Sequence, residues 1–204
     1  MAALPRESHE PRRWMDGPAV KPAVIILDMA KGYGWQPGSY GYEMVAKVRR
    51  LKDAAHAAGV QVIHVNSMRR PTDNVGESHM MVGTDGLEVI PELQPMDQDI
   101  QIYKRCLGGF SHNDLDYTLR CMGVDCVILA GASTDNCVIW TAAEAFQLQY
   151  KVVVVEDCTI THGKARAEAG GKEAAVLIMR TVLHSDVAPL DDVVKKYLQT
   201  ATPE

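Results

Sequence analysis

Cys137 occupies a position in the sequence that favours a nucleophilic side chain. An apolar, strand-like run at residues 127–130 meets a turn of small and polar residues at 131–136, and an apolar run with helical spacing begins at the cysteine. A thiol at the N-terminus of a helix faces unpaired backbone N–H groups and the positive end of the helix dipole, which favour the thiolate. Because the thiolate is the nucleophilic form, this position predicts a reactive cysteine.

Two other strand-like segments end in chargeable residues, residues 23–28 at Asp28 and residues 99–104 at Lys104. If the three strands lie parallel in one sheet, their carboxyl ends share an edge, where open α/β sheets bind ligands. Asp28 could then take the proton of the thiol and return it to a departing amine, while Lys104 would hold Asp28 and favour the thiolate. The alternative is that Asp28 caps a turn and Lys104 is a solvated residue.

The elements that would position these side chains alternate along the sequence. Strand-like segments are expected at 23–28, 61–65, 99–104, 126–130, 151–155 and 185–187, and helices at 42–58, 114–122, 137–149, 164–181 and 190–198. Near-continuous Val/Ile strands between helices are typical of a parallel sheet covered on both faces. The sequence therefore predicts an α/β fold of three layers, α/β/α, with a mostly parallel, doubly wound central sheet.

Composition narrows the class of protein. With 204 residues, 47% hydrophobic and 23% charged, the chain is expected to form one folded domain at 23–204. Residues 1–22 contain four prolines and no apolar core of a signal peptide, so an extended arm is expected there. The net charge of -5 disfavours nucleic acid or an anionic membrane as a partner, and no apolar run is long enough to span a membrane.

The five cysteines are an odd number without C-x-x-C spacing, which indicates reduced thiols in a cytoplasmic protein. Among them Cys106, which lies beside Lys104, is the rival of Cys137 as a reactive thiol. The long polar segment at 66–98 exceeds the length of a simple connection and is expected to carry function.

Four motifs, in order along the chain, give the sequence a resemblance to a known group. They are Asp28 at a strand end, GTDGLEVIPEL at 83–93, Lys104 followed by Phe110 and Asp114-Leu115, and GASTDNCV at 131–138. The sequence resembles the isochorismatase-like cysteine hydrolase superfamily over roughly residues 21–193. That superfamily includes nicotinamidases, N-carbamoylsarcosine amidase, biuret and ureidoacrylate hydrolases, and isochorismatase.

The resemblance implies a catalytic triad of Asp28, Lys104 and Cys137. It also implies a cis peptide between Ser133 and Thr134, and an oxyanion hole from the backbone N–H groups of Ser133 and Cys137. The implied enzyme cleaves the C–N bond of a small amide, carbamoyl or ureido substrate through a thioester and releases ammonia or an amine. Members of the group are commonly dimers or tetramers, so a homodimer or homotetramer is expected, with no cofactor.

Nicotinamidases of this superfamily bind a metal through an Asp-x-His pair and a further His after the second strand. Here residues 65–71 read VNSMRRP, without that pair, so no metal is expected. Arg69 and Arg70 stand in that place, and one of them could bind a substrate carboxylate, although a solvated pair is an equal interpretation. Tyr33, Trp35, Phe110 and Trp140 could form aromatic walls of the substrate site, although aromatic residues at such positions more often pack in the core. Trp35 and Phe110 are the expected pair, because each follows a catalytic strand end.

Several rival functions stay open. Isochorismatase cleaves a vinyl ether without a cysteine nucleophile, so Cys137 argues against it, and nicotinamidase lacks its metal ligands here. A non-catalytic binding protein on the same fold would have a Cys137 that reacts with iodoacetamide no faster than the other thiols. A flavodoxin-like nucleotide-binding domain is disfavoured because the turns lack a glycine-rich phosphate motif.

Overall fold

A six-stranded sheet forms the centre of the computed structural model, which describes residues 20–73 and 80–198. All neighbouring strands pair in parallel, in the order β3-β2-β1-β4-β5-β6. The strands are β1 (Pro22–Leu27), β2 (Gln61–Ser67), β3 (Ile100–Lys104), β4 (Cys126–Ala132), β5 (Lys151–Ile160) and β6 (Asp186–Ala188). The expected α/β/α fold with a doubly wound parallel sheet is confirmed.

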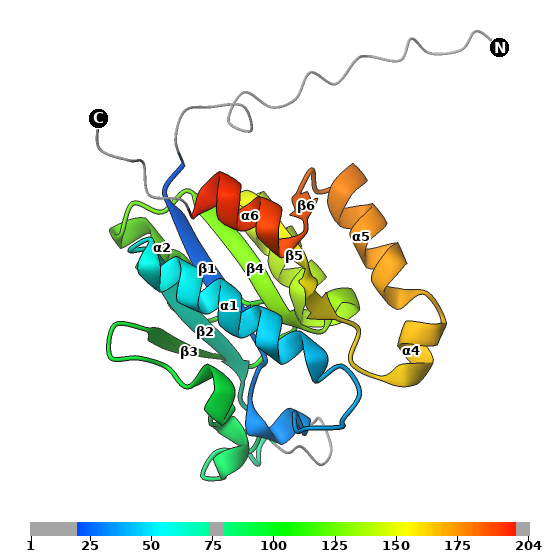
Figure 1. Ribbon diagram of the computed structural model, residues 1–204. Coiled ribbons are helices and arrows are strands. Elements are labelled where there is room, and N and C mark those ends of the chain that lie inside the picture. The colour runs from blue at the N-terminus through cyan, green and yellow to red at the C-terminus, as the bar shows by residue number, and fades with distance from the viewer. Residues whose placement is uncertain (1–19, 74–79, 199–204) are drawn as a thin grey trace, which may run out of the picture.

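Helices cover both faces of this sheet. α1 and α6 lie across one face, and α2, α3 and α5 contribute to the core on the other (Figure 1). The helices are α1 (Glu43–Ala57), α2 (Leu115–Cys121), α3 (Ile139–Gln147), α4 (Lys164–Glu168), α5 (Gly171–Thr181) and α6 (Leu190–Tyr197). The arm expected at residues 1–22 lies outside the described residues as far as residue 19, and Pro22 already begins β1.

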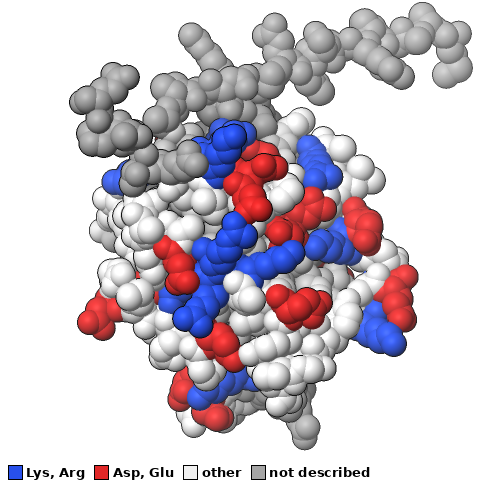
Figure 2. All heavy atoms as spheres, in the orientation of Figure 1, with Lys and Arg blue, Asp and Glu red and all other residues white. Residues whose placement is uncertain are grey.

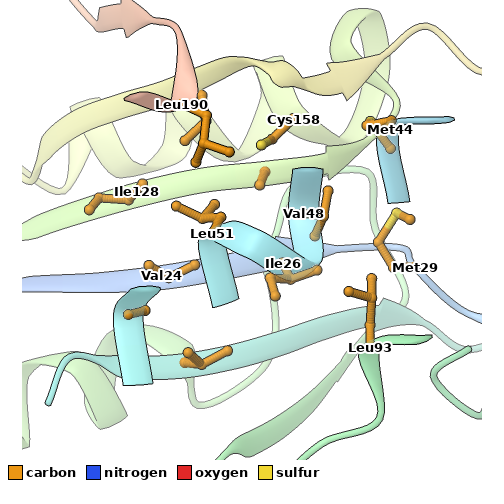
Figure 3. Close-up of a cluster of buried hydrophobic side chains, with 14 of the residues drawn as sticks. Val24, Ile26, Met29, Met44, Val48, Leu51, Leu93, Ile128, Cys158 and Leu190 are labelled. Atoms are coloured by element: carbon orange, nitrogen blue, oxygen red, sulfur yellow. The ribbon is translucent and has the colours of Figure 1, made fainter. Parts of the chain in front are cut away.

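The two central strands, β1 and β4, are apolar because both of their faces are buried. In β1, Val24 and Ile26 point into the core beneath α1 and α6, whereas Ala23, Ile25 and Leu27 point into the opposite core. Figure 3 shows the first of these cores, where residues of β1 and β4 meet those of α1 and α6. The labelled side chains there include Val24, Ile26, Val48, Leu51, Ile128 and Leu190.

The order of the strands places a crevice between β1 and β4. The chain runs from β1 outward through β2 to β3, and then returns to pair β4 with the other side of β1. Such a reversal leaves a crevice at the carboxyl ends of the two central strands, because the connecting helices leave in opposite directions. Asp28 directly follows β1, and Cys137 lies in the turn after β4.

Gly131 allows these two strand ends to approach closely. It pairs with Leu27, and a Cβ atom at this position would overlap the backbone of Leu27. Its φ of 107° also lies in a region that L-residues rarely adopt. Glycine is therefore required where the turn that carries Cys137 leaves the sheet.

Three elements differ from the sequence-based prediction. The helix expected at 164–181 is divided into α4 and α5, because Gly170 adopts a left-handed conformation with φ 79°. The helix expected to begin at Cys137 begins at Ile139, after a π-helical turn at Thr134–Val138. β5 extends to Ile160 instead of residue 155, because a shift of register lets its second half pair with the end of β4.

A buried ionic cluster ties α1 to β2 and to the segment before β3. The Asp99 carboxylate, whose side chain is fully buried, accepts the Met96 N–H (2.9 Å) and contacts His56 Nε2 (2.6 Å) and Lys52 Nζ (3.4 Å). His64 Nε2, inside β2, lies 3.8 Å from the same carboxylate. Hydrogen bonds and the neighbouring basic groups outweigh burial, so the pKa of Asp99 is held well below its usual value.

Stability should fall as the pH is lowered from 7 to 5. Burial lowers the pKa of His64, and the Lys52 charge adds to this effect, although Asp99 opposes both. Between the pKa of His64 in the folded protein and its value of about 6.5 in the unfolded chain, the unfolded chain binds a proton that the folded protein does not. Acid therefore favours unfolding in this pH range. Urea unfolding at both pH values measures this slope. A His64→Gln variant should lose part of it, and an unchanged slope would contradict the interpretation.

Figure 2 shows the face covered by α1 and α6, where basic and acidic side chains are interspersed. Ion pairs join Lys47 to Asp157 and Arg50 to Asp191 across this surface. Within the described part of the chain, no helix combines the length and hydrophobicity needed to span a membrane.

Candidate active site

Asp28 is held at the end of β1 with its two carboxylate oxygens in different environments. Its side chain is fully buried, and the Ser67 N–H at the end of β2 donates to Oδ1 (2.6 Å). Oδ2 lies 3.0 Å from Lys104 Nζ, yet this ion pair lacks hydrogen-bond geometry, and no described residue donates a hydrogen bond to Oδ2. Oδ2 is therefore the oxygen available to receive a proton.

Lys104 reaches the crevice from β3, the strand at the edge of the sheet. Among the described residues, four acceptors lie within hydrogen-bonding distance of its buried ammonium and share its three N–H donors: Ser67 Oγ (3.0 Å), Cys137 Sγ (3.3 Å) and the carbonyl oxygens of Cys106 and Leu107 (both 3.2 Å). Burial alone would lower the pKa of Lys104, but the negative charge of Asp28 is the largest of the opposing effects, and the pKa is raised. The ammonium therefore remains charged beside the thiol.

The structure thus brings Asp28, Lys104 and Cys137 together from three separate strand ends. Cys137 is only 6% exposed and lies two residues before α3. Burial, followed by the negative charge of Asp28, raises its pKa to about 12, although Lys104 opposes both effects. The resting state is consequently a thiol instead of the thiolate expected from a helix N-terminus, so its proton must leave as the sulfur attacks.

The cis peptide lies one residue earlier than predicted. It joins Ala132 to Ser133, and the prediction of a cis bond between Ser133 and Thr134 was wrong. The bond stands where β4 ends and the turn begins, and no sequence signal distinguishes the two adjacent peptides. The Ser133 carbonyl accepts hydrogen bonds from Asn136 N–H (3.0 Å) and Val138 N–H (3.1 Å), but not from the Cys137 N–H between them.

Ser133 also connects the turn to the segment after β5. Its hydroxyl donates to Asp135 Oδ1 (2.8 Å) and accepts the His162 N–H (2.7 Å). Arg166, from α4, donates to the His162 carbonyl and lies 3.5 Å from Asp135 Oδ2. The nucleophile turn is therefore supported by the chain that follows β5 as well as by β4.

Both aromatic rings expected to form the substrate walls are largely buried. Trp35 is 6% exposed, donates from Nε1 to the Asp28 carbonyl (3.2 Å) and packs edge-on against His162, with 5.0 Å between ring centroids. Phe110 is 8% exposed and packs against Tyr150 in the core beneath α2, α3 and α5. A role for either ring in binding substrate stays a prediction.

The two arginines differ in their surroundings. The Arg69 guanidinium donates to the carbonyl oxygens of Met68 (3.2 Å) and Arg105 (2.9 Å). The exposed Arg70 guanidinium makes no hydrogen bond or ion pair with any described residue, and it lines a pocket of about 690 Å³. Arg105, Cys106 and His112 line the same pocket, whose wall thus includes the segment that holds Lys104.

Ser67 is a site residue that sequence reasoning did not select, and Tyr33 is an aromatic candidate that it ranked below Trp35 and Phe110. The Tyr33 hydroxyl donates to Ser67 Oγ (3.1 Å), and burial together with the nearby charge of Asp28 raises the pKa of its phenol. A short 3₁₀ helix at Lys31–Tyr33 turns this ring toward the triad. Its place five residues after Asp28 is a signal that could have identified it, but the spacing alone does not favour it over Trp35.

No metal site is evident where nicotinamidases hold theirs. The Ser67 N–H donates a hydrogen bond to Asp28, and the Ser67 hydroxyl oxygen accepts hydrogen bonds from Lys104 and Tyr33. Among the described residues, no group of three His, Cys, Asp or Glu could hold a metal ion. His64 is buried within β2 beside Asp99. The described side chains at the end of β2 therefore do not fit a metal, and we derive no step through one.

Comparison with known proteins identifies the family of this chain. A family model described as the isochorismatase domain matches residues 22–186. The chain is 28% identical over 171 residues to the ureidoacrylate amidohydrolase RutB of Agrobacterium fabrum, covering 67% of this chain and 75% of the relative. It is 30% identical over 158 residues to YwoC of Bacillus subtilis, an uncharacterized isochorismatase family protein, covering 73% and 82% of the two chains.

A solved structure supports the same relationship. N-carbamoylsarcosine amidase from Thermoplasma acidophilum superimposes with a TM-score of 0.73 at 28% identity, covering 84% of this chain and 97% of that one. The fold and the matched sequence define the class of protein, a small α/β hydrolase. The chain belongs to the isochorismatase family.

Proposed function

We propose that this protein is a metal-independent cysteine amidohydrolase that cleaves the C–N bond of a small amide, carbamoyl or ureido compound. It acts, like its named relatives, on carbon–nitrogen bonds other than peptide bonds. The observation that carries the proposal is the buried contact of Lys104 Nζ with both Cys137 Sγ (3.3 Å) and Asp28 Oδ2 (3.0 Å), because it joins a nucleophile to a charged stabiliser and a base.

The first half of the reaction forms a thioester. Asp28 Oδ2 accepts the thiol proton as Cys137 Sγ attacks the substrate carbonyl carbon, and the carbonyl π electrons move to oxygen. The N–H groups of Ser133 and Cys137 would stabilise the oxyanion, each such donor typically contributing about 2.7–4 kcal/mol. The tetrahedral intermediate then collapses, Asp28 gives its proton to the leaving nitrogen, and ammonia or an amine departs.

The second half restores the enzyme. Water gives a proton to Asp28 and attacks the thioester carbonyl, and the C–S bond breaks to release the acid. Asp28 then returns the proton to the sulfur. Throughout both halves Lys104 remains cationic, and it offsets the negative charge that passes between Asp28, the sulfur and the oxyanion.

An ammonia-release assay tests the proposal. The panel would contain nicotinamide, maleamate, biuret, N-carbamoyl amino acids and ureidoacrylate, each with and without EDTA. Turnover of an amide or ureido compound that survives EDTA is the expected result. Turnover that requires a metal would contradict the mechanism, and failure to cleave any member would favour a binding protein on the same fold. Cytoplasmic location and a homodimeric or homotetrameric state stay predictions.

If the substrate carries a carboxylate, Arg70 is the residue expected to bind it. Its guanidinium is free of described partners and lines the pocket beside Cys106, whereas that of Arg69 is directed at backbone carbonyls. Arg70→Ala should raise KM about tenfold or more with little change in kcat, since hydrogen bonds to charged groups are worth about 1.5–3 kcal/mol. Steady-state kinetics on an acidic substrate measure this, and unchanged KM for both Arg69→Ala and Arg70→Ala would rule it out.

A further inference from the structure

The loop at residues 106–111 supplies two of the acceptors that hold the Lys104 ammonium. These are the carbonyl oxygens of Cys106 and Leu107, each 3.2 Å from Nζ. A lysine side chain has many rotamers, and fixing it costs up to about 2 kcal/mol. Whatever fixes this loop therefore helps to keep the ammonium 3.3 Å from Cys137 Sγ.

The loop is bonded to α3, the helix that follows the nucleophile turn. The Gly109 N–H donates to Thr141 Oγ1 (3.0 Å), and the Phe110 N–H donates to Glu144 Oε2 (2.8 Å). The Ser111 hydroxyl donates to the other oxygen of Glu144. Two side chains, three residues apart on one face of α3, thus bind three consecutive residues of the loop.

Thr141 connects the loop directly to Cys137. Its hydroxyl is fully buried, accepts the Gly109 N–H and donates to the Cys137 carbonyl (2.6 Å). Both hydrogen-bonding functions of this hydroxyl are therefore used, and each joins a part of the chain that contacts the Lys104–Cys137 pair. Loss of the hydroxyl would leave the buried Gly109 N–H without this acceptor and the Cys137 carbonyl without this donor.

The glycines of the loop allow this close contact. A Cβ atom on Gly108 would overlap the Glu144 carboxylate, and one on Gly109 would lie 3.0 Å from Thr141 Cγ2. A side chain at either position would therefore require Glu144 or Thr141 to shift. The two glycines therefore allow the loop to pack closely against Thr141 and Glu144.

We infer that Thr141 and Glu144 are positioning residues that hold the 106–111 loop so that its carbonyl groups direct the Lys104 ammonium at Cys137. The importance of that ammonium in catalysis rests on the proposed function, but its effect on the thiol does not. Because Lys104 is the group that favours the thiolate, a displaced ammonium makes Cys137 less reactive at any given pH.

The test measures alkylation of Cys137 by iodoacetamide at pH 8.5, followed by mass spectrometry of its peptide. Thr141→Val should slow alkylation about tenfold, and Glu144→Gln should also slow it. Thr141→Ser, which keeps the hydroxyl, should remain within about twofold of the unmodified protein. Thr181→Val is the matched control, because the exposed Thr181 makes the same type of bond to the Leu177 carbonyl at the far end of α5.

A double-mutant cycle with Lys104→Met separates positioning from general destabilisation. In the Lys104→Met background, Thr141→Val should cause no further loss of Cys137 reactivity. An equal loss in both backgrounds, or an unchanged rate in Thr141→Val and Glu144→Gln despite a lower Tm, would overturn the inference. Glu144→Gln alone decides the matter if Thr141→Val does not fold. Alkylation requires no amide turnover, so the result is independent of the proposed function.

Discussion

Replacing Asp28 with asparagine is expected to lower turnover by about 10³-fold while making the Cys137 thiol more acidic. An amide has nearly the shape of the carboxylate but cannot accept the thiol proton at the Oδ2 position, which no described residue satisfies with a hydrogen bond. The negative charge of Asp28 also raises the pKa of Cys137, so its removal should lower that pKa. More thiolate combined with less turnover distinguishes a base from a group that only adjusts the electrostatics of the site.

Two measurements on the Asp28→Asn variant check this result. Steady-state kinetics give turnover, and the ultraviolet absorbance of the thiolate as a function of pH gives the ionisation of Cys137, with Cys137→Ala as the blank. Asp53→Asn on the exposed surface of α1 controls for the loss of a carboxylate. Turnover within tenfold of the unmodified enzyme would show that Asp28 is not the base.

Asp99→Asn should be the most destabilising single change at the opposite end of the sheet. The substitution removes the negative charge that faces Lys52, which is only 5% exposed, and His56. Removing one partner of a buried ion pair typically costs about 3–5 kcal/mol, because the other charge is left buried without compensation. In a chain of this size such a loss lowers Tm by roughly 10 °C, which calorimetry can measure.

A matched variant shows whether burial is the cause. Asp191→Asn removes the partner of Arg50 from an ion pair on the surface, where the Asp191 side chain is 74% exposed. Exposed pairs contribute about 0–1 kcal/mol, so its Tm should change by no more than a few degrees. Equal changes in Tm for the two variants would contradict the account of the cluster.

The convergence of the three reactive side chains could be inferred from sequence because it depends on strand ends. Asp28 and Lys104 end apolar strands, and Cys137 follows a third, so a parallel sheet brings all three to one edge. The protonation of Cys137 could not be inferred in the same way. It depends on how completely the thiol is buried and on its contact with Asp28, and both arise from tertiary packing.

The finer geometry was less accessible to sequence reasoning. Trp35 and Tyr33 lie two residues apart in one loop, and the 3₁₀ turn at Lys31–Tyr33 decides which of them meets the triad. The cis bond joins Ala132 to Ser133, one residue before the predicted position. Both positions lie in the same stretch of small residues, so the sequence does not distinguish them. The pair Gly170 and Gly171 is a sequence signal for a break in the helix. Because the residues on both sides keep a helical pattern, one continuous helix was predicted.

The most direct test of the central claim compares Cys137→Ala with Cys121→Ala on whichever substrate the panel identifies. Cys121 is an exposed residue of α2 and serves as the matched control. Loss of the nucleophile should lower kcat at least about 10⁴-fold, while Cys121→Ala should retain full turnover. If Cys137→Ala still hydrolyses the substrate at a comparable rate, the thioester mechanism is wrong.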